Sequence, residues 1–266
     1  MTNSPNEPPQ VPPPAYTPGG APVDTRPVSS MQRLVGVLFS PIETLADIAR
    51  RPNILAPLLL IVIVTIVTTA IIVPKMDFET MLRETFQKQS QGKMSEADVD
   101  RNVTFAAGFA KVMAWASPII GIGVLAIIAA IFLGLFRAFG GEGNFKQYFS
   151  VTLYTWVPQI IKSLAMVTII LARGEPVNPE TMPTILMSHP GALVDMKENA
   201  IAFALLSSIE LFNIWTIVLM VIGFAFVSGL SRTKAAVIVV SLYVVTVLFK
   251  LAGAAMQALG NKAASS

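Results

Sequence analysis

The sequence predicts an all-α integral membrane protein, a bundle of five transmembrane helices with amphipathic interfacial helices and a disordered, proline-rich N-terminal tail. Hydrophobic residues make up 53% of the 266 residues and charged residues only 13%, against roughly a quarter in soluble domains. Apolar segments long enough to cross a bilayer recur five times along the chain. This composition therefore suits a chain whose apolar side chains face lipid.

The chain divides into a tail, a membrane domain and a short C-terminal tail. Residues 1–30 hold nine of the 19 prolines, and such a segment cannot bury enough apolar surface to offset the entropy of ordering. We therefore predict that residues 1–30 are disordered. The membrane domain is expected over 31–256, and 257–266 follow as a short tail.

Two short amphipathic helices are expected before the first span, divided at Ser40. Ser40 is a suitable N-cap, Pro41 suits the first helical position, and Glu43 would complete a capping box. The two helices have one apolar and one polar face, so we expect them to lie in the membrane interface.

The apolar segments themselves give the five predicted spans. They cover residues 54–73, 112–136, 150–172, 201–230 and 235–251. Between the first two, Ser95 is expected to cap a helix that runs into the second span, and Asn144 to cap the helix of the third. Pro158 predicts a kink in the third span, since proline removes a helical hydrogen bond.

The second span carries small residues at every fourth position. They are Ala126, Ala130, Gly134 and Ala138. Such a stripe permits close approach of helix backbones, so we expect it to pack against a neighbouring helix.

Polar side chains inside the third and fourth spans form the candidate site. Glu210 is the single ionisable group of residues 201–230, and Lys162 lies in the middle of the third span. Counted from the same membrane edge, the two residues fall at matching depths, about 15 Å at 1.5 Å per residue. An unpaired charge at that depth costs roughly 2.5–3.5 kcal/mol, which favours a facing pair. The alternative is that residues 211–231 span alone, so that Glu210 reaches the interface while Lys162 snorkels. Gln159 and Asn213 continue the polar stripes of the two helices.

The sequence lacks the residues that several classes of function require. The chain has no cysteine and one histidine, and its 19 basic residues form no dense block, which argues against disulfides, a metal site and nucleic acid. No cofactor-binding motif is recognisable. No predicted span contains an aspartate or histidine, and Phe226 stands where a rhomboid-type motif has glycine. We therefore expect no catalytic, cofactor-binding or metal-binding residue and no enzymatic activity.

Basic residues near the span ends predict the orientation. One side carries Arg33, Arg50, Arg51, Arg137, Lys146, Arg232 and Lys234. The other side has only Arg173, Lys197 and Lys262 outside the long charge-balanced loop. Because short cytoplasmic loops carry the excess of Lys and Arg, the N-terminus is expected in the cytoplasm and the C-terminus outside.

Several short motifs occur in an order that suggests a family. They are Phe39-Ser40-Pro41-Ile42-Glu43-Thr44, then Tyr154 and Pro158, then Leu211-Phe212-Asn213-Ile214-Trp215, and Ser228-Gly229-Leu230-Ser231-Arg232. With this order the chain resembles the bacterial branch of the Yip family (Ypt-interacting proteins) over about residues 33–255. The motif positions that the resemblance marks are Pro41, Glu43, Tyr154, Pro158, Asn213 and Trp215.

The resemblance implies an all-helical bundle that acts through partners, in eukaryotic members including Rab-type GTPases. The Asp-Leu-Tyr-Gly-Pro type of stretch of those members is absent here, which argues against a GTPase partner. The implied location is a bacterial inner (plasma) membrane.

Two functions remain open at this point. The first is a non-enzymatic membrane protein that organises or binds other membrane components, with the lipid bilayer, other membrane proteins or a second copy of itself as partners. The second is a small transporter or channel that uses Gln159, Lys162, Glu210 and Asn213, since polar groups inside spans often mark a transport path.

Overall fold

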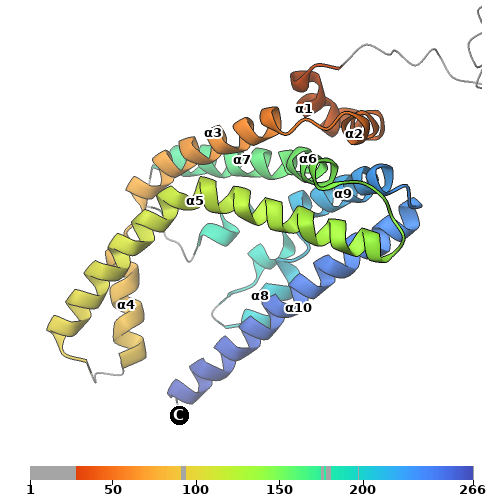
Figure 1. Cartoon of the computed structure of the whole chain (residues 1–266). Coiled ribbons are helices and arrows are strands. Elements are labelled where there is room, and N and C mark those ends of the chain that lie inside the picture. Colours follow the sequence, from red (N-terminus) through yellow and green to blue (C-terminus); the bar gives the residue numbers. More distant parts are fainter. Residues whose placement is uncertain (1–27, 91–93, 175–176, 178–180, 197, 266) are drawn as a thin grey trace, which may run out of the picture.

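A computed structural model describes residues 28–90, 94–174, 177, 181–196 and 198–265. Of the predicted disordered tail, residues 1–30, the first 27 lie outside the described residues, whereas Ser29 caps α1 and Ser30 is its first residue. The helices are α1 (Ser30–Phe39), α2 (Pro41–Arg50), α3 (Leu55–Ile72), α4 (Phe78–Ser90), α5 (Glu96–Ala138), α6 (Phe145–Thr155), α7 (Val157–Arg173), α8 (Ala200–Leu206), α9 (Leu211–Ser228) and α10 (Arg232–Ser265), with short 3-10 turns at Val73–Lys75, Met182–Thr184 and Pro190–Leu193 (Figure 1).

The all-α prediction is confirmed for the described residues, where the only β-pairing is an isolated bridge between Met76 and Val177. By length and composition, 5 helical segments could cross a membrane. These segments are Leu55–Lys75, Glu96–Ala138, Phe145–Arg173, Leu211–Ser228 and Arg232–Gly260.

The prediction of one continuous span over 201–230 is wrong. The chain forms the short helix α8, turns, and starts α9 only at Leu211. The turn bonds run from Ser208 N to Leu205 O and from Ile209 N to Leu206 O. These i→i+3 bonds tighten the end of α8 and break the α-helical ladder that an apolar sequence alone would suggest.

The limits of other helices differ from the predicted limits by fewer residues. The third span consists of α6 and α7, which meet at Trp156, so the break precedes Pro158 and the proline lies in the first turn of α7. The helix of the fifth predicted span, α10, continues past residue 251. It extends to Ser265, where a separate tail was expected from residue 257. The second predicted span is the apolar part of α5, and Ser95 caps this helix as expected.

The predicted capping box at Ser40 does not form. Ser40 stands between α1 and α2, and Pro41 is the first residue of α2, but the Ser40 side chain makes no capping bond. Capping boxes form instead at Ser29 and Asn144, each with a glutamine three residues later. A serine side chain caps only where its backbone lets the oxygen reach the amides of the second or third helical residue.

The two N-terminal helices pack onto the bundle through one face of α2. Leu45 and Ile48 of this helix are fully buried, and α2 lies against α6 and α9. Gln147 Nε2 donates to the Ala49 carbonyl at 2.8 Å. The apolar face predicted for α2 is therefore covered by protein.

Four aromatic rings join α5, α6 and α9 at the centre of the core. The ring centroids of Phe132 and Phe224 are 4.7 Å apart, and Tyr148 lies 5.3 Å from Phe224. Phe136 contacts both Tyr148 and Phe224, at 5.7 and 5.6 Å. Tilted pairs at such distances contribute beyond the area that they bury.

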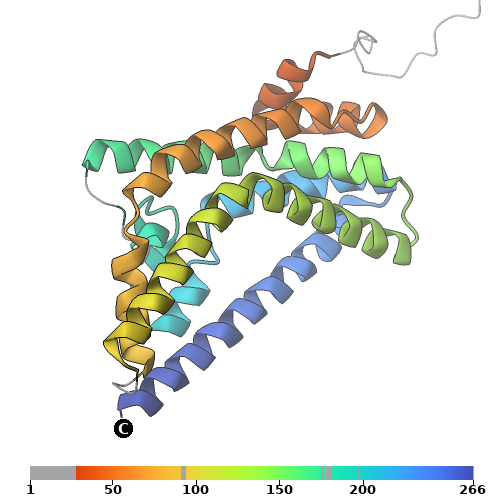
Figure 2. The same cartoon turned by 60° about the vertical axis from the view of Figure 1, so that its left-hand side comes forward.

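Two segments project away from this packed centre (Figures 1 and 2). α4 and the first half of α5 form a hairpin, joined by an ion pair of 2.6 Å between Arg83 and Asp100. α5 bends in its middle, and we assign the bend to Pro118, which lies inside the helix. α10 starts beside the end of α9 and then diverges from α5.

The close packing around Gly223 makes a prediction about stability. A Cβ added to Gly223 would lie 2.5 Å from Val151 Cγ1, so Gly223→Ala should lower stability by ~1–3 kcal/mol, the usual cost of overpacking. The measurement is the apparent melting temperature of the purified protein in detergent. Gly121→Ala is the control, because no heavy atom lies within 4 Å of its added Cβ. Equal melting temperatures of the two variants would contradict the assigned close approach.

Candidate functional site

Glu210 lies at the start of α9 rather than in the middle of a span. Its side chain caps the helix, accepting from Phe212 N at 3.2 Å and from Asn213 N at 2.9 Å. The backbone of Glu210 is extended, as is typical of an N-cap residue. A carboxylate at this position also interacts favourably with the helix dipole.

The second partner of Glu210 is Lys162, which α7 brings to it from the neighbouring helix. Lys162 Nζ lies 3.3 Å from Glu210 Oε2, and the two side chains are 26% and 2% exposed. The carboxylate is thus held by one ammonium group, two backbone amides and the side chain of Ser188. A buried charge is tolerated when its hydrogen-bonding capacity is used in this way.

One helical turn deeper, α7 and α9 are joined by neutral polar groups. Gln159 Nε2 donates to Asn213 Oδ1 at 3.0 Å and to Thr216 Oγ1 at 3.2 Å. The structure therefore brings all four candidate residues, Gln159, Lys162, Glu210 and Asn213, to the interface of α7 and α9.

α10 contributes two further residues that the sequence reasoning missed. The Tyr243 hydroxyl donates to the Ser208 carbonyl, and Lys250 Nζ donates to Ser207 Oγ at 2.7 Å. Both acceptors lie in the turn between α8 and α9. Tyr243 and Lys250 are seven residues apart, a spacing that puts them on one helix face and could have indicated their shared surroundings.

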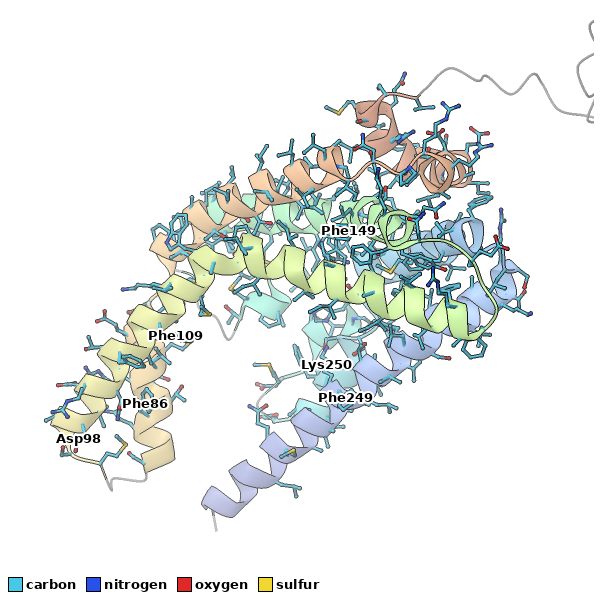
Figure 3. All side chains as sticks on the ribbon, viewed as in Figure 1. Phe86, Asp98, Phe109, Phe149, Phe249 and Lys250 are labelled. Atoms are coloured by element: carbon cyan, nitrogen blue, oxygen red, sulfur yellow. The ribbon has the colours of Figure 1, made fainter. Side chains whose placement is uncertain are left out.

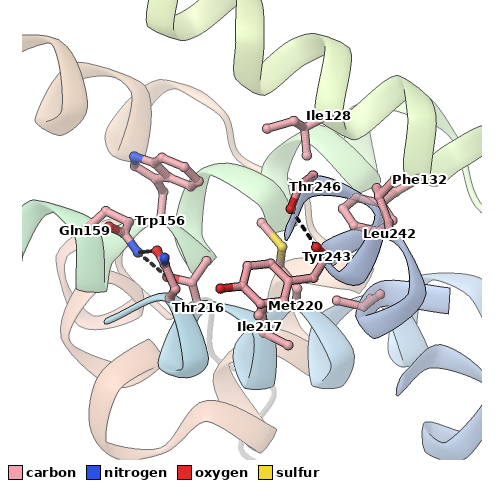
Figure 4. Close-up of a pocket in the computed structure, with 12 residues that line it drawn as sticks. Ile128, Phe132, Trp156, Gln159, Thr216, Ile217, Met220, Leu242, Tyr243 and Thr246 are labelled. Carbon is pink, nitrogen blue, oxygen red and sulfur yellow. Dashed lines mark hydrogen bonds between the residues drawn. The ribbon is translucent and has the colours of Figure 1, made fainter. Parts of the chain in front are cut away.

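A cavity of about 260 Å³ lies beside the neutral polar groups. Its apolar wall consists of Ile128, Phe132, Trp156, Ile217, Met220, Val239 and Leu242, and its polar groups come from Gln159, Asn213, Thr216, Tyr243 and Thr246. Figure 4 shows Gln159 and its hydrogen bonds on one side and Tyr243 and Thr246 on another. Apolar walls with a few convergent polar groups are typical of sites for small molecules.

The remaining family-motif positions lie elsewhere. Pro41 and Glu43 are in the first turn of α2, and Pro158 is buried in the first turn of α7. Trp215 is partly buried against the core. Tyr154 is fully buried. Of the motif residues, only Asn213 belongs to the polar cluster.

A second buried ion pair joins the N-terminal helices. Arg33 Nη2 lies 2.7 Å from Asp47 Oδ2, and Arg33 Nη1 donates to the Arg51 carbonyl at 2.9 Å. Tyr154 lies within electrostatic range of both side chains. The sequence reasoning used Arg33 only as a marker of orientation and missed this pair, because nothing in the spacing of the two residues predicts that α1 folds back on α2.

Metal binding has no visible basis in the described part of the chain. No group of three or more His, Asp or Glu side chains there is placed to hold a metal ion.

Comparisons with known proteins agree with the motif pattern. The family model of the Yip1 domain matches residues 35–254. The membrane protein YknW of Bacillus subtilis (strain 168) is 28% identical over 220 residues, which cover 82% of this chain and 88% of that relative. No solved structure matches the chain significantly.

The Lys162–Glu210 contact predicts energetic coupling. Lys162→Met leaves a buried carboxylate without its cation, so it should destabilise strongly, by up to ~3–5 kcal/mol. In Lys162→Met/Glu210→Gln both charges are gone, while the Gln oxygen can still accept one capping amide bond. We expect the double variant to be more stable than Lys162→Met.

The coupling is measured as a double-mutant cycle on detergent unfolding, with an expected interaction energy of ~1–3 kcal/mol. Glu210→Lys is less informative, because lysine cannot accept the amide bonds of Phe212 and Asn213. Additive effects of the two single substitutions would show that the pair contributes nothing.

Proposed function

This chain belongs to the Yip1 domain family, and from that premise we propose that it is a non-enzymatic multi-pass membrane protein that works by binding and organising other membrane components. The observation that carries the proposal is the outward position of the small-residue stripe of α5. Ala130, Gly134 and Ala138 are exposed, and a Cβ added to Gly134 would meet no heavy atom within 4 Å.

The fourth stripe residue, Ala126, is partly buried against the core, so the chain's own helices leave three of the four small residues uncovered. Between apolar helices in a bilayer, small residues favour association because backbones can approach closely. The three uncovered residues support contact with a transmembrane helix of another molecule, and a second copy of this chain is the first candidate.

The absence of an enzymatic role is part of the same proposal. It rests on the sequence, which has no cysteine and a single histidine, and offers no nucleophile with a base at a spacing typical of a hydrolase. A GTPase partner is not part of the proposal.

The transport alternative has weaker support. Lys162 and Glu210 satisfy each other, and most residues around the cavity are apolar. A path for a hydrated solute needs polar groups along its length, whereas these walls suit hydrocarbon.

We further propose a bacterial plasma membrane with the N-terminus in the cytoplasm. Hydrogen bonds gather the loops that carry the basic residues: Glu142 N donates to the Ser228 carbonyl at 2.9 Å, and Gln147 joins the end of α2. Arg137, Lys146 and Arg232 thus lie near one end of the bundle, as expected of a cytoplasmic face.

The absence of native cysteine makes the association testable by disulfide cross-linking in membranes. Ala130→Cys should give a covalent dimer on mild oxidation, and addition of Gly134→Leu should reduce it several-fold by keeping the backbones apart. Val237→Cys is the control, because this exposed residue of α10 lies outside the stripe. If Ala130→Cys forms neither dimers nor adducts with other membrane proteins, the proposal fails.

The orientation in the membrane can be tested in the same cysteine-free protein. Cysteines at Ser4 and Ser266 should react with an impermeant thiol reagent from opposite faces of the membrane, Ser266→Cys from outside. Labelling of both from one face would contradict the five-span topology.

A further inference from the structure

The cavity and the ion pair belong to one layered arrangement built by three helices. Each helix presents a polar residue to the cavity and a charged residue three or four positions away. The pairs are Gln159 and Lys162 on α7, Asn213 of α9 with the N-cap residue Glu210, and Thr246 and Lys250 on α10. Residues at this spacing share a helix face, so a charged layer of Lys162, Glu210 and Lys250 adjoins one end of the cavity.

This charged layer has more positive than negative charge. Both oxygens of Glu210 are engaged, by Lys162 and by the amides of α9. Lys250 Nζ donates its hydrogen bond to a neutral group, the Ser207 hydroxyl, and it lies within electrostatic range of Lys162. Two ammonium groups and one fully used carboxylate leave an excess positive charge, which favours an anion.

The cavity on the other side of the polar groups favours hydrocarbon. Its volume of about 260 Å³ lies just below the ~300–1,000 Å³ of sites that enclose a whole small ligand. It therefore suits one part of a larger molecule. The cavity is bounded by α5 and α10, which diverge from each other (Figures 1 and 4), and Thr246 at its edge is exposed.

The charged layer and the apolar cavity lie at the levels of α9 that match the head groups and the hydrocarbon of a bilayer. α9 has 18 residues, or ~27 Å at 1.5 Å per residue, which is close to the hydrocarbon thickness. Glu210 stands at its first end, where head groups begin, and the cavity residues Asn213 to Met220 lie in the next turns inward. Figure 3 shows Lys250 on the part of α10 beside α8.

We propose that this site binds one anionic phospholipid, with an acyl chain in the cavity between α5, α9 and α10 and the phosphate at the ammonium groups of Lys250 and Lys162. The amide and hydroxyl groups of Gln159, Asn213 and Tyr243 lie between these two ends, at the level of the ester carbonyls. The inference deepens the proposed function, since the membrane component bound here is a lipid.

The experiment is native mass spectrometry of the purified protein titrated with lipids. One molecule of phosphatidylglycerol should bind at a several-fold lower lipid concentration than one molecule of phosphatidylcholine. Phosphatidylcholine has the same chains but no net charge. Glycerol 3-phosphate, which has the anion without chains, should neither bind nor compete. Lys250→Gln should weaken phosphatidylglycerol binding about fivefold, the effect of one Lys near a lipid surface, and leave phosphatidylcholine unchanged.

Two variants separate the charge effect from the cavity. Lys234→Gln makes the same charge change near the other end of α10 and should bind as the unmodified protein does. Thr246→Trp fills the edge of the cavity and should weaken the binding of the first lipid molecule, for both lipids. The Thr246 hydroxyl donates to the Tyr243 carbonyl of its own helix, so folding should tolerate its loss.

Three results would overturn the proposal. They are equal binding of the two lipids, an equal loss in Lys250→Gln and Lys234→Gln, and displacement of phosphatidylglycerol by glycerol 3-phosphate. Because lipid addition is measured on the isolated chain, its failure is distinguishable from a failure of the proposed function. Cross-linking at Ala130 reports that function and does not require the cavity.

Discussion

The carboxylate of Glu210 must find all its partners inside the protein, and the arrangement of α7, α8 and α9 follows from this requirement. A charged group removed from water costs several kcal/mol unless it is paired and hydrogen-bonded. Lys162 supplies the opposite charge from α7, and the first amides of α9 supply hydrogen bonds. The helix can offer these amides only where it begins, so the chain has to break before Glu210.

The break has a second consequence, because it exposes polar backbone groups of the turn between α8 and α9. α10 covers them: Tyr243 donates to the Ser208 carbonyl, and Lys250 to the Ser207 hydroxyl. Polar backbone groups that are removed from water need hydrogen-bond partners within the protein. The path of α10 across α8 therefore belongs to the same polar network as the Lys162–Glu210 pair.

At the opposite end of the bundle, packing rather than charge fixes the helices. The rings of Phe132, Phe136, Tyr148 and Phe224 hold α5, α6 and α9 together, and Gly223 lets Val151 approach closely. Because the helices are tied at this end, α5 and α10 diverge toward the other end. The divergence leaves the cavity beside the polar network. The proposed lipid site is thus a product of this packing arrangement, whereas the exposed stripe lies on the other face of the packed end of α5.

The sequence by itself determined the fold class, the number of spans and the family. These properties follow from local quantities: the length of apolar segments, the caps at Ser95 and Asn144, and short motifs such as the one around Asn213. The sequence also predicted that Lys162 and Glu210 face each other, although the residue count behind this prediction assumed a continuous helix from residue 201, whereas α9 begins only at Leu211.

Tertiary structure alone decided where the apolar segment 201–230 breaks and what surrounds each polar group. A run of apolar residues contains no signal for a turn when the turn is stabilised by residues far along the chain, here Lys162 and Tyr243. The burial of Arg33 against Asp47, and the exposure of the stripe at Gly134, likewise depend on which helices are neighbours. Hydrophobicity specifies that a helix lies in the bilayer, whereas its neighbours are selected by side-chain packing and by the partners that buried charges require.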